Sequence, residues 1–544
     1  MPHRRWIRLV ATLCCTALAL PSAQARPASR PNVLVIVADD LGFSDLGAFG
    51  GEIATPNLDA LALSGLRLAN FHTEAACAPT RAMLLTGSDS HRVGLGNMPE
   101  SMAPNQAGRR GYEGHLRADT ATLAERLSAG GYRTLFSGKW HLGTAPDQDP
   151  HARGFQHSFA MLNCCHDHFG QGLSTDRSKM FGYTRNGETV TSLPPDFYSS
   201  DFFASQLIDQ LRATRSESPF FAYLAFTAPH APLQAPPATI AKYRGRYDAG
   251  YDVLREQRLE RQRKLGLLAP AAQPHRPVDT VPWESLSAEE RRTSSRKMEI
   301  YAAMVEDLDK AVGRVIAELK AEGEFARTTI VFLSDNGAEA RDPAPRPGTP
   351  IPPLATLGGP KTYANYGAGW AQAATAPSWR FKSFATEGGI HAPAFVSGPV
   401  IRRPGTIGRA YTNARDVAPT LLDLAGVAVT PGRFAGRDVP PIDGLSWRGL
   451  LAGKAAVYPP DHAVGSELFG SRSLRRGDWK ITDIGDGIWH LFDLARDPGE
   501  TRDLAAAEPA RKAALIAEWD RYARDVGVVL PDPPFHPNPP RDHD

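Results

Sequence analysis

Short runs of apolar residues alternate along the chain with segments whose apolar residues recur every three or four positions. Residues 32–38, 220–226 and 328–333 are almost entirely apolar, which is typical of strands buried on both faces of a sheet. Apolar residues between 297 and 320 follow helical spacing and predict a helix facing the core rather than a cofactor. The alternation predicts an α/β fold with a large, mainly parallel sheet sandwiched by helices.

Local end signals mark further helices in the same region. Residues 55–65 (TPNLDALALSG) combine a threonine cap, proline at the first helical position and a terminal glycine. Residues 119–131 (DTATLAERLSAGG) form a similar segment that leads into a strand predicted over 132–141. Residues 341–379 are rich in Pro, Gly and Ala and are expected to form a long irregular loop.

The pattern changes near residue 430. Short strands with turns and a final helix over 509–526 predict a smaller C-terminal α+β domain with an antiparallel sheet. About 500 residues exceed what one core supports. We therefore expect an α/β catalytic domain over 30–430, the smaller domain over 431–530, and a Pro-rich tail over 531–544.

The first 25 residues have the features of a secretory signal peptide. Three arginines precede an apolar stretch over 9–20, and Ala23-Gln24-Ala25 offers a cleavage site. A buried N-terminal strand is the alternative, although its flanks do not suit it. A periplasmic or secreted protein is expected, exported by an ordinary signal or by a twin-arginine signal at Arg4-Arg5. No later segment is long enough to span a bilayer, so no stable membrane insertion is expected.

Charge and cysteine content narrow the function further. Cleavage would remove three arginines and no acidic residue, which changes the net charge from +2 to −1 and argues against a nucleic-acid partner. Three cysteines would remain, too few for a disulfide framework. Cys164 and Cys165 are adjacent and form either a vicinal disulfide or two free thiols. Cys77 has no obvious partner, so it is buried and inert, reactive, or chemically modified.

Acidic and amide residues follow two of the predicted strands. Asp39 and Asp40 come directly after the first strand, and Asp335 and Asn336 follow the strand over 328–333. In open α/β sheets, ligands bind outside the carboxyl ends of the strands. A single aspartate there is usually a turn or cap residue. Two such groups, all oxygen donors, predict a site for a hard cation such as Ca²⁺ or Mg²⁺.

Basic residues occupy similar positions and predict a site for an anionic group. Individually, each lysine could be a surface residue and each histidine could bond to backbone. Together they offer positive charge and groups able to transfer protons. Arg81 lies one helical turn after Cys77, whose place near a helix N-terminus also favours an anion. The set consists of Arg81, Lys139, His141, His230 and Lys382.

Residues 77–87 (CAPTRAMLLTG) match the sulfatase signature, in which Cys-x-Pro-Ser/Thr/Ala-Arg precedes Thr-Gly. Further segments resemble bacterial arylsulfatases in the same order along nearly the whole chain, among them NVLVIVADDLGFSD, GKWHLG, FFAYLAFTAPHAPLQAP, IVFLSDNGAE and FKSFATEGGI. The sequence therefore resembles the formylglycine-dependent sulfatases of the alkaline phosphatase superfamily. One departure is MLNCCHDHFG, where related enzymes commonly carry small residues in place of the two cysteines.

The resemblance implies an arylsulfatase-type hydrolase that converts sulfate esters to alcohol and inorganic sulfate. Cys77 would be oxidised by a formylglycine-generating maturation enzyme to Cα-formylglycine, whose gem-diol is the nucleophile, with Asp335 as a possible base. One Ca²⁺ would be bound by Asp39, Asp40, Asp335, Asn336 and residue 77. Arg81, Lys139, His141 and Lys382 would hold the diol or the sulfate, and His230 would lie beside the leaving-group oxygen.

Two other functions fit the same motifs. Phosphonate monoester or phosphodiester hydrolases share the fold, the metal site and formylglycine, and their substrates resemble sulfate esters in shape and charge. An unmodified, inactive protein that binds sulfated ligands is the second alternative. The complete set of metal and basic residues argues against the inactive protein. The small-molecule sulfate ester expected as substrate is an aryl sulfate, the usual substrate of the family.

Overall fold

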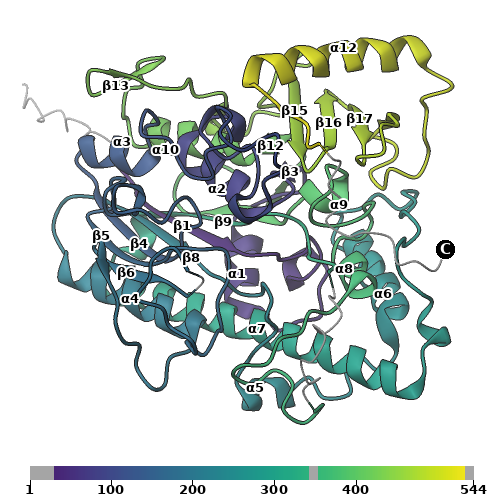
Figure 1. The fold of residues 1–544 in the computed structure, drawn as a ribbon, viewed down its shortest axis with the longest axis horizontal. Helices are drawn as coiled ribbons and strands as arrows, with labels where there is room; N and C mark the ends of the chain where they lie inside the picture. The colour runs from purple at the N-terminus through teal and green to yellow at the C-terminus, as the bar shows by residue number, and fades with distance from the viewer. Residues whose placement is uncertain (1–29, 180, 342–352, 533–544) are drawn as a thin grey trace, which may run out of the picture. The chain divides into compact units, whose positions relative to one another are not determined.

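The computed structural model describes residues 30–179, 181–341 and 353–532, and its largest element is one mixed sheet (Figure 1). Contacts divide the chain into Met1–Arg30 and Pro31–Asp544, and all elements named below belong to the second unit. The order of the sheet is β11 (Thr406–Gly408), β2 (Leu66–Leu68), β10 (Ala394–Ser397), β9 (Thr328–Ser334), β1 (Asn32–Ala38), β8 (Phe220–Ala225), β4 (Arg133–Lys139), β5 (His157–Met161), β6 (Tyr183–Arg185) and β7 (Glu188–Thr189).

The centre of this sheet is parallel. β1 pairs in parallel with both β8 and β9, and β4 pairs in parallel with β8 and β5. In the described part of the sheet, antiparallel pairs occur only toward its two edges. At one edge β10 joins β9 and β2, and at the other β6 joins β5 and β7. The predicted α/β fold with a mainly parallel sheet is therefore confirmed.

β1 shows why its sequence is continuously apolar. Leu34, Ile36 and Ala38 enter the hydrophobic core on one face of the sheet. The alternate residues Val33, Val35 and Val37 enter a second core on the opposite face. Because side chains alternate along a strand, burial of both faces requires an apolar residue at every position.

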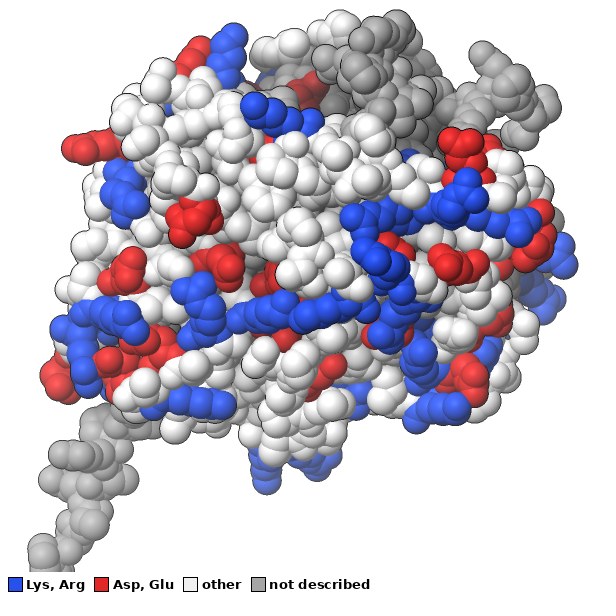
Figure 2. Space-filling view, turned by 90° about the horizontal axis from the view of Figure 1, so that it is seen from below, with Lys and Arg blue, Asp and Glu red and all other residues white. Residues whose placement is uncertain are grey.

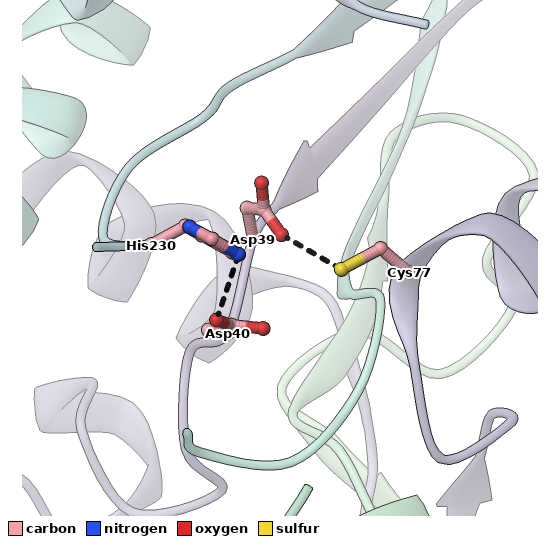
Figure 3. A group of neighbouring side chains, drawn as sticks. All are labelled: Asp39, Asp40, Cys77 and His230. Carbon is pink, nitrogen blue, oxygen red and sulfur yellow. Dashed lines mark hydrogen bonds and ion pairs between the residues drawn. The ribbon is translucent and has the colours of Figure 1, made fainter. Parts of the chain in front are cut away.

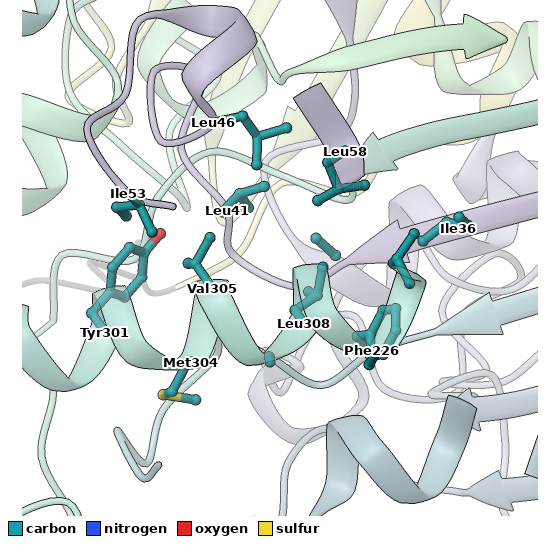
Figure 4. Packing of buried hydrophobic residues seen from close by; sticks show 14 of the residues in the cluster. Ile36, Leu41, Leu46, Ile53, Leu58, Phe226, Tyr301, Met304, Val305 and Leu308 are labelled. Carbon is teal, nitrogen blue, oxygen red and sulfur yellow. The ribbon is translucent and has the colours of Figure 1, made fainter. Parts of the chain in front are cut away.

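The first core lies under α1 (Pro56–Ser64), α4 (Ser199–Ala213) and the long helix α7 (Ala288–Ala321). α7 begins with a capping box, in which the Ser287 side chain accepts from the Glu290 backbone N–H. Figure 4 shows Tyr301, Val305 and Leu308 of α7 packed among residues from the loop after β1. The helix predicted over 297–320 is confirmed and is longer than its apolar stripe indicated.

The opposite face is covered by α2 (Cys77–Thr86), α3 (Leu123–Ala129) and α10 (Val417–Leu424) (Figure 1). The predicted helices at 55–65 and 119–131 correspond to α1 and α3. α3 also carries a capping box, with Thr122 accepting from the Glu125 N–H. The α2 helix, which begins at Cys77, is thus packed directly against the core of the sheet.

The C-terminal part forms the smaller α+β unit expected from the sequence. Its antiparallel sheet contains β15 (Ala463–Leu468), β16 (Ser471–Arg476), β17 (Trp479–Asp483) and β18 (His490–Asp493), in that order. α12 (Pro509–Val526) packs on it through Leu515 and Trp519. The exact domain limits, 30–430 and 431–530, stay a prediction.

The prediction of an irregular loop over 341–379 was wrong for its second half. Residues 368–374 form the helix α8 (Ala368–Ala374), in which Trp370 is 1% exposed. Trp370 packs edge-on against Tyr251 of α6 (Gly250–Lys264), so tertiary contacts stabilise a helix that composition did not indicate. Residues 342–352, the signal peptide predicted over 1–25 with Arg4-Arg5, and most of the predicted tail lie outside the described residues.

The remaining described helices and strands are short. They are α5 (Pro237–Ala241), α9 (Glu387–Ile390), α11 (Arg448–Leu451), β3 (Phe71–His72), β12 (Thr412–Asn413), β13 (Arg433–Phe434) and β14 (Arg437–Asp438). Among the described residues, none of the helices combines the length and apolar character that a membrane span requires.

Basic and acidic side chains lie beside one another on the face shown in Figure 2. On α7, Glu318 pairs with Arg212 of α4, and Glu306 pairs with Lys242. In both pairs the basic side chain is exposed, whereas the glutamate is largely buried. The solvent side of α7 is therefore a charged surface, whereas its inner side supplies the core.

Candidate active site

The site begins where β1 and β9 end at the same level. In the parallel pair, Ala38 lies opposite Ser334, so the two following segments leave the sheet side by side. The Asp335 N–H donates to the Ala38 carbonyl oxygen at 3.1 Å, and the Asp40 N–H donates to Asp335 Oδ1 at 3.3 Å. The Asn336 amide donates to Asp40 Oδ1 at 2.7 Å. The structure thus brings together the four residues that the strand ends suggested.

Cys77 is the first residue of α2, and the sequence around it fixes that position. The Thr80 hydroxyl accepts from the Glu74 N–H at 2.9 Å and donates to the Glu74 carbonyl oxygen at 3.3 Å, which ties the preceding turn to the helix. Pro79 lacks an N–H in the first turn, where that group has no partner within the helix. Cys77 Sγ lies 3.4 Å from Asp39 Oδ1 (Figure 3).

Arg81 connects this helix to two strands of the sheet. Its Nε donates to Asp335 Oδ2 at 2.8 Å, and its Nη1 donates to the Lys139 carbonyl oxygen at 3.0 Å. The side chain is buried, so these bonds hold a permanent positive charge beside Cys77.

Two buried lysines pair with the carboxylates that follow β1. Lys139 Nζ donates to Asp39 Oδ2 at 2.7 Å, and Lys382 Nζ donates to Asp40 Oδ1 at 2.7 Å. Burial alone would raise the pKa of Asp39, but Lys139, with His230 and Arg81, holds it well below its usual range. Burial would likewise lower the pKa of Lys382, but Asp40 raises it well above the usual value. The Asp39–Lys139 pair therefore stays charged at neutral pH.

The two predicted histidines lie on different sides of this group. His230 Nε2 is 3.6 Å from Asp40 Oδ2 (Figure 3), and its Nδ1 donates to the Ala231 carbonyl oxygen at 2.6 Å. His141 Nε2 is instead 3.3 Å from Glu100 Oε2. Its Nδ1 is buried without a hydrogen-bond partner among the described residues. Burial lowers the pKa of His141, which favours the neutral ring although Glu100 opposes this.

Burial disfavours the thiolate form of Cys77. Burial raises its pKa well above the usual value, and the nearby Lys139 and Lys382 reduce that effect only in part. A cysteine acts as a nucleophile as its thiolate. Asp335 also titrates high, because burial and then repulsion by Asp39 raise its pKa to about 6. Plain thiol chemistry is therefore a poor explanation for this site.

The oxygen atoms here suit a metal ion. Asp39, Asp40, Cys77 and His230 offer ligand atoms that all lie within 4.8 Å of one another (Figure 3). Asp40 Oδ2 and Asn336 Oδ1 are buried and have no hydrogen-bond partner among the described residues. Buried oxygens without partners are costly, and a cation would satisfy them. The carboxylate oxygens of Asp39 and Asp40 and the amide oxygen of Asn336 fit a hard cation, whereas Asp335 is not among the residues of this group.

Sequence reasoning missed Glu339 and Glu100, which lie near this group. Glu339 is 3% exposed, and its Oε2 lies 3.5 Å from Lys382 Nζ while it also binds Arg341. Glu339 follows Asn336 by only three residues, and this short spacing could have indicated that it lies near the site. Glu100 carries no such signal, because 41 positions separate it from His141. Cys164 lies near Glu100 and His141. Cys164 and Cys165 are free thiols, with Sγ atoms 3.2 Å apart, rather than a disulfide.

Comparison with known proteins gives a consistent result. A family model described as Sulfatase matches residues 31–427. An uncharacterized sulfatase of Schizosaccharomyces pombe is 45% identical over 92% of this chain and 94% of that protein. An arylsulfatase of Klebsiella aerogenes is 39% identical over 79% of this chain and 94% of that protein. The crystal structure of Ps i-CgsB, at 23% identity, covers 91% of this chain and 93% of that chain with a TM-score of 0.67, which shows a shared fold.

Proposed function

The chain belongs to the sulfatase family and is a sulfuric ester hydrolase, and from this premise we propose that it hydrolyses aryl sulfates. The observation that carries the proposal is the buried group around Cys77, where the side chains of Arg81, Lys139 and Lys382 face carboxylates from two strand ends. The similarity to the Klebsiella aerogenes arylsulfatase supports an aryl leaving group.

We propose that residue 77 acts as Cα-formylglycine. The hydrated aldehyde supplies a hydroxyl nucleophile that does not depend on forming a thiolate. The support lies in the surroundings of Cys77, whose thiol has a raised pKa and stands at the N-terminus of α2, where partial positive charge stabilises an anion.

We further propose that Asp39, Asp40, Asp335, Asn336 and residue 77 hold one Ca²⁺. When bound, the ion supplies positive charge next to the sulfate oxygens. The unpartnered Asp40 Oδ2 and Asn336 Oδ1 support this assignment. Cation binding to Asp39 and Asp40 would also weaken their pairing with Lys139 and Lys382, which leaves these ammonium groups available to an anionic substrate.

The side chains around residue 77 then have separate roles in ester cleavage. Arg81, fixed by Asp335 and the Lys139 carbonyl oxygen, orients residue 77. Lys139 and Lys382 bind sulfate oxygens and stabilise the charge that develops on them. In its doubly protonated form, His230 donates the Nε2 proton to the departing alcohol oxygen, while Nδ1 keeps its bond to the Ala231 carbonyl oxygen. His141 accepts a proton at its free Nδ1 when sulfate is released.

Location and maturation complete the proposal. We propose a periplasmic or secreted enzyme with a signal peptide over residues 1–25, modified at Cys77 by a formylglycine-generating enzyme. The catalytic domain covers residues 30–430, and residues 431–530 form the second domain.

Two measurements test the proposed function. Mass spectrometry of the peptide containing residue 77 should show the mass of formylglycine in place of cysteine. Initial rates should give a higher kcat/KM for 4-nitrophenyl sulfate than for 4-nitrophenyl phenylphosphonate. An unmodified cysteine in active enzyme would refute the nucleophile. A higher kcat/KM for the phosphonate would replace the substrate proposal with the phosphonate hydrolase alternative.

A further inference from the structure

A second group of metal-binding side chains borders the active site. Glu100, His141 and Cys164 offer ligand atoms that lie within 4.8 Å of one another. They come from three separate segments: the 3₁₀ helix Pro99–Ser101, the residues that follow β4, and the residues that follow β5. Cys165 adds a second sulfur, 3.2 Å from that of Cys164. The fold therefore places one carboxylate, one imidazole and one thiol together, with a second thiol beside the first.

These donors differ in kind from those around Cys77. Thiols and imidazoles are the ligands of zinc and of softer ions, whereas the first group is dominated by oxygen. Tetrahedral zinc with bonds of about 2.0–2.3 Å needs ligand atoms roughly 3.3–3.8 Å apart. The ligand atoms of Glu100, His141 and Cys164 lie within 4.8 Å of one another, and the Cys165 thiol lies beside that of Cys164.

His141 presents one ring nitrogen to this group. Its Nε2 lies 3.3 Å from Glu100 Oε2, and the residue is only 3% exposed. Its backbone is held at a φ of 59°, a conformation that non-glycine residues seldom adopt and that often marks functional sites. The imidazole is thus held beside Glu100.

The group is open to ions from solvent and has the charge to hold one. The side chain of Glu100 is 43% exposed, and the two cysteines are half-buried. Lys139, the nearest buried cation, is already neutralised by Asp39 at 2.7 Å. Metal binding releases the thiol protons, so the carboxylate and two thiolates together outweigh the charge of a divalent ion.

We propose that Glu100, His141, Cys164 and Cys165 form a site for a thiophilic divalent cation, Zn²⁺ or Cd²⁺, separate from the proposed Ca²⁺ site. Occupation takes the imidazole of His141 and so inhibits the enzyme. The binding part stands on these four side chains alone. The inhibition part rests on the role proposed for His141.

Spectroscopy tests the binding part without reference to activity. Cd²⁺ added to the full-length, reduced enzyme in excess Ca²⁺ should produce a thiolate-to-cadmium charge-transfer band in the ultraviolet, with one ion per chain. Cys164→Ala and Cys165→Ala should each lose about half of the band, and the double variant should lose all of it. Thr175→Ala, at an exposed position outside the group, should keep it. A full band in the double variant would overturn the proposed site.

Inhibition by Zn²⁺ tests the second part. The wild-type enzyme should lose activity with increasing Zn²⁺ at constant Ca²⁺, and the double cysteine variant should need at least tenfold more Zn²⁺ for the same loss. Its activity without Zn²⁺ should stay close to wild type, because neither cysteine is placed in the catalytic group. Cadmium binding without any inhibition would overturn the inhibitory role and leave the site intact. If every sample were inactive, the result would count against the proposed function and not against the metal site.

Discussion

The Lys139 ammonium donates to the Asp39 carboxylate at 2.7 Å, and both side chains are completely buried. This pair joins the ends of β4 and β1 next to Cys77. Three buried carboxylates and three buried cations balance one another here: Asp39, Asp40, Asp335, Arg81, Lys139 and Lys382. A dianionic or monoanionic substrate and a divalent cation can both enter such a balanced group, because each relieves the charge that the other introduces.

The first prediction concerns the nucleophile. Cys77→Ser should lower kcat by about 10⁴-fold or more, a loss typical of removing a nucleophile, because serine provides only one hydroxyl and cannot regenerate. Folding should be unaffected, since the side chains have similar volume and Cys77 is a single buried residue at the start of α2. Steady-state assays and thermal unfolding measure the two effects. Turnover at the wild-type rate would contradict the role of residue 77.

The second prediction concerns the metal. Asp40→Asn removes a charge from the group that contains the unpartnered Asp40 Oδ2 and should raise the Ca²⁺ concentration needed for half-maximal activity at least tenfold. Chelation should inactivate the wild-type enzyme, and Ca²⁺ should restore it. Asp209→Asn, an exposed substitution on α4, serves as the matched control. Unchanged activity after both chelation and Asp40→Asn would show that the site holds no required metal.

The third prediction tests whether the charge of Lys139 contributes to catalysis. Lys139→Met keeps the length of the side chain but removes the charge opposite Asp39, so kcat/KM should fall by about 10²–10³-fold through lost stabilisation of developing charge. Lys264→Met, whose side chain is 71% exposed on α6, should have no effect. Initial rates over a range of substrate concentrations measure both. An equal loss in the two variants would point to misfolding instead of catalysis.

Local patterns predicted much of the site. The sequence places Asp39 and Asp335 directly after apolar strands, and the parallel pairing of β1 with β9 makes those strand ends meet. Cys77 and Arg81 are one helical turn apart, so a helix brings them to one side. In both cases, regular secondary structure converts short spacing in the sequence into proximity.

Contacts between distant segments could not be predicted in this way. Glu100 reaches His141 across 41 positions, and His91 reaches Glu467 across 376. Neither pair follows from a strand or helix period, because loops and the docking of the C-terminal sheet determine where the acids lie. The same holds for α8, whose Trp370 is stabilised by aromatic contacts from other segments.

The last prediction concerns pH and stability, and it arises at His91. The His91 Nδ1 lies 3.0 Å from Asp89 Oδ1, and Nε2 lies 3.2 Å from Glu467 Oε2 of β15. Burial opposes a charge on the ring, but bonds to Asp89 and Glu467 outweigh it and raise the pKa to about 10. The protonated ring therefore links the segment after α2 to the C-terminal sheet.

The direction of the effect follows from the two protonation states. An unfolded histidine has a pKa of about 6.5, so the folded chain binds this proton more tightly. The stabilisation is complete below about pH 6.5 and is lost as the pH rises toward 10. Urea unfolding at constant Ca²⁺ should accordingly give a free energy of unfolding that falls across this window. His91→Gln should remove most of the slope. His275→Gln should keep it, because the His275 ring bonds the Arg276 carbonyl oxygen and burial lowers its pKa. An identical slope in the wild type and His91→Gln would mean that another group controls the alkaline loss of stability.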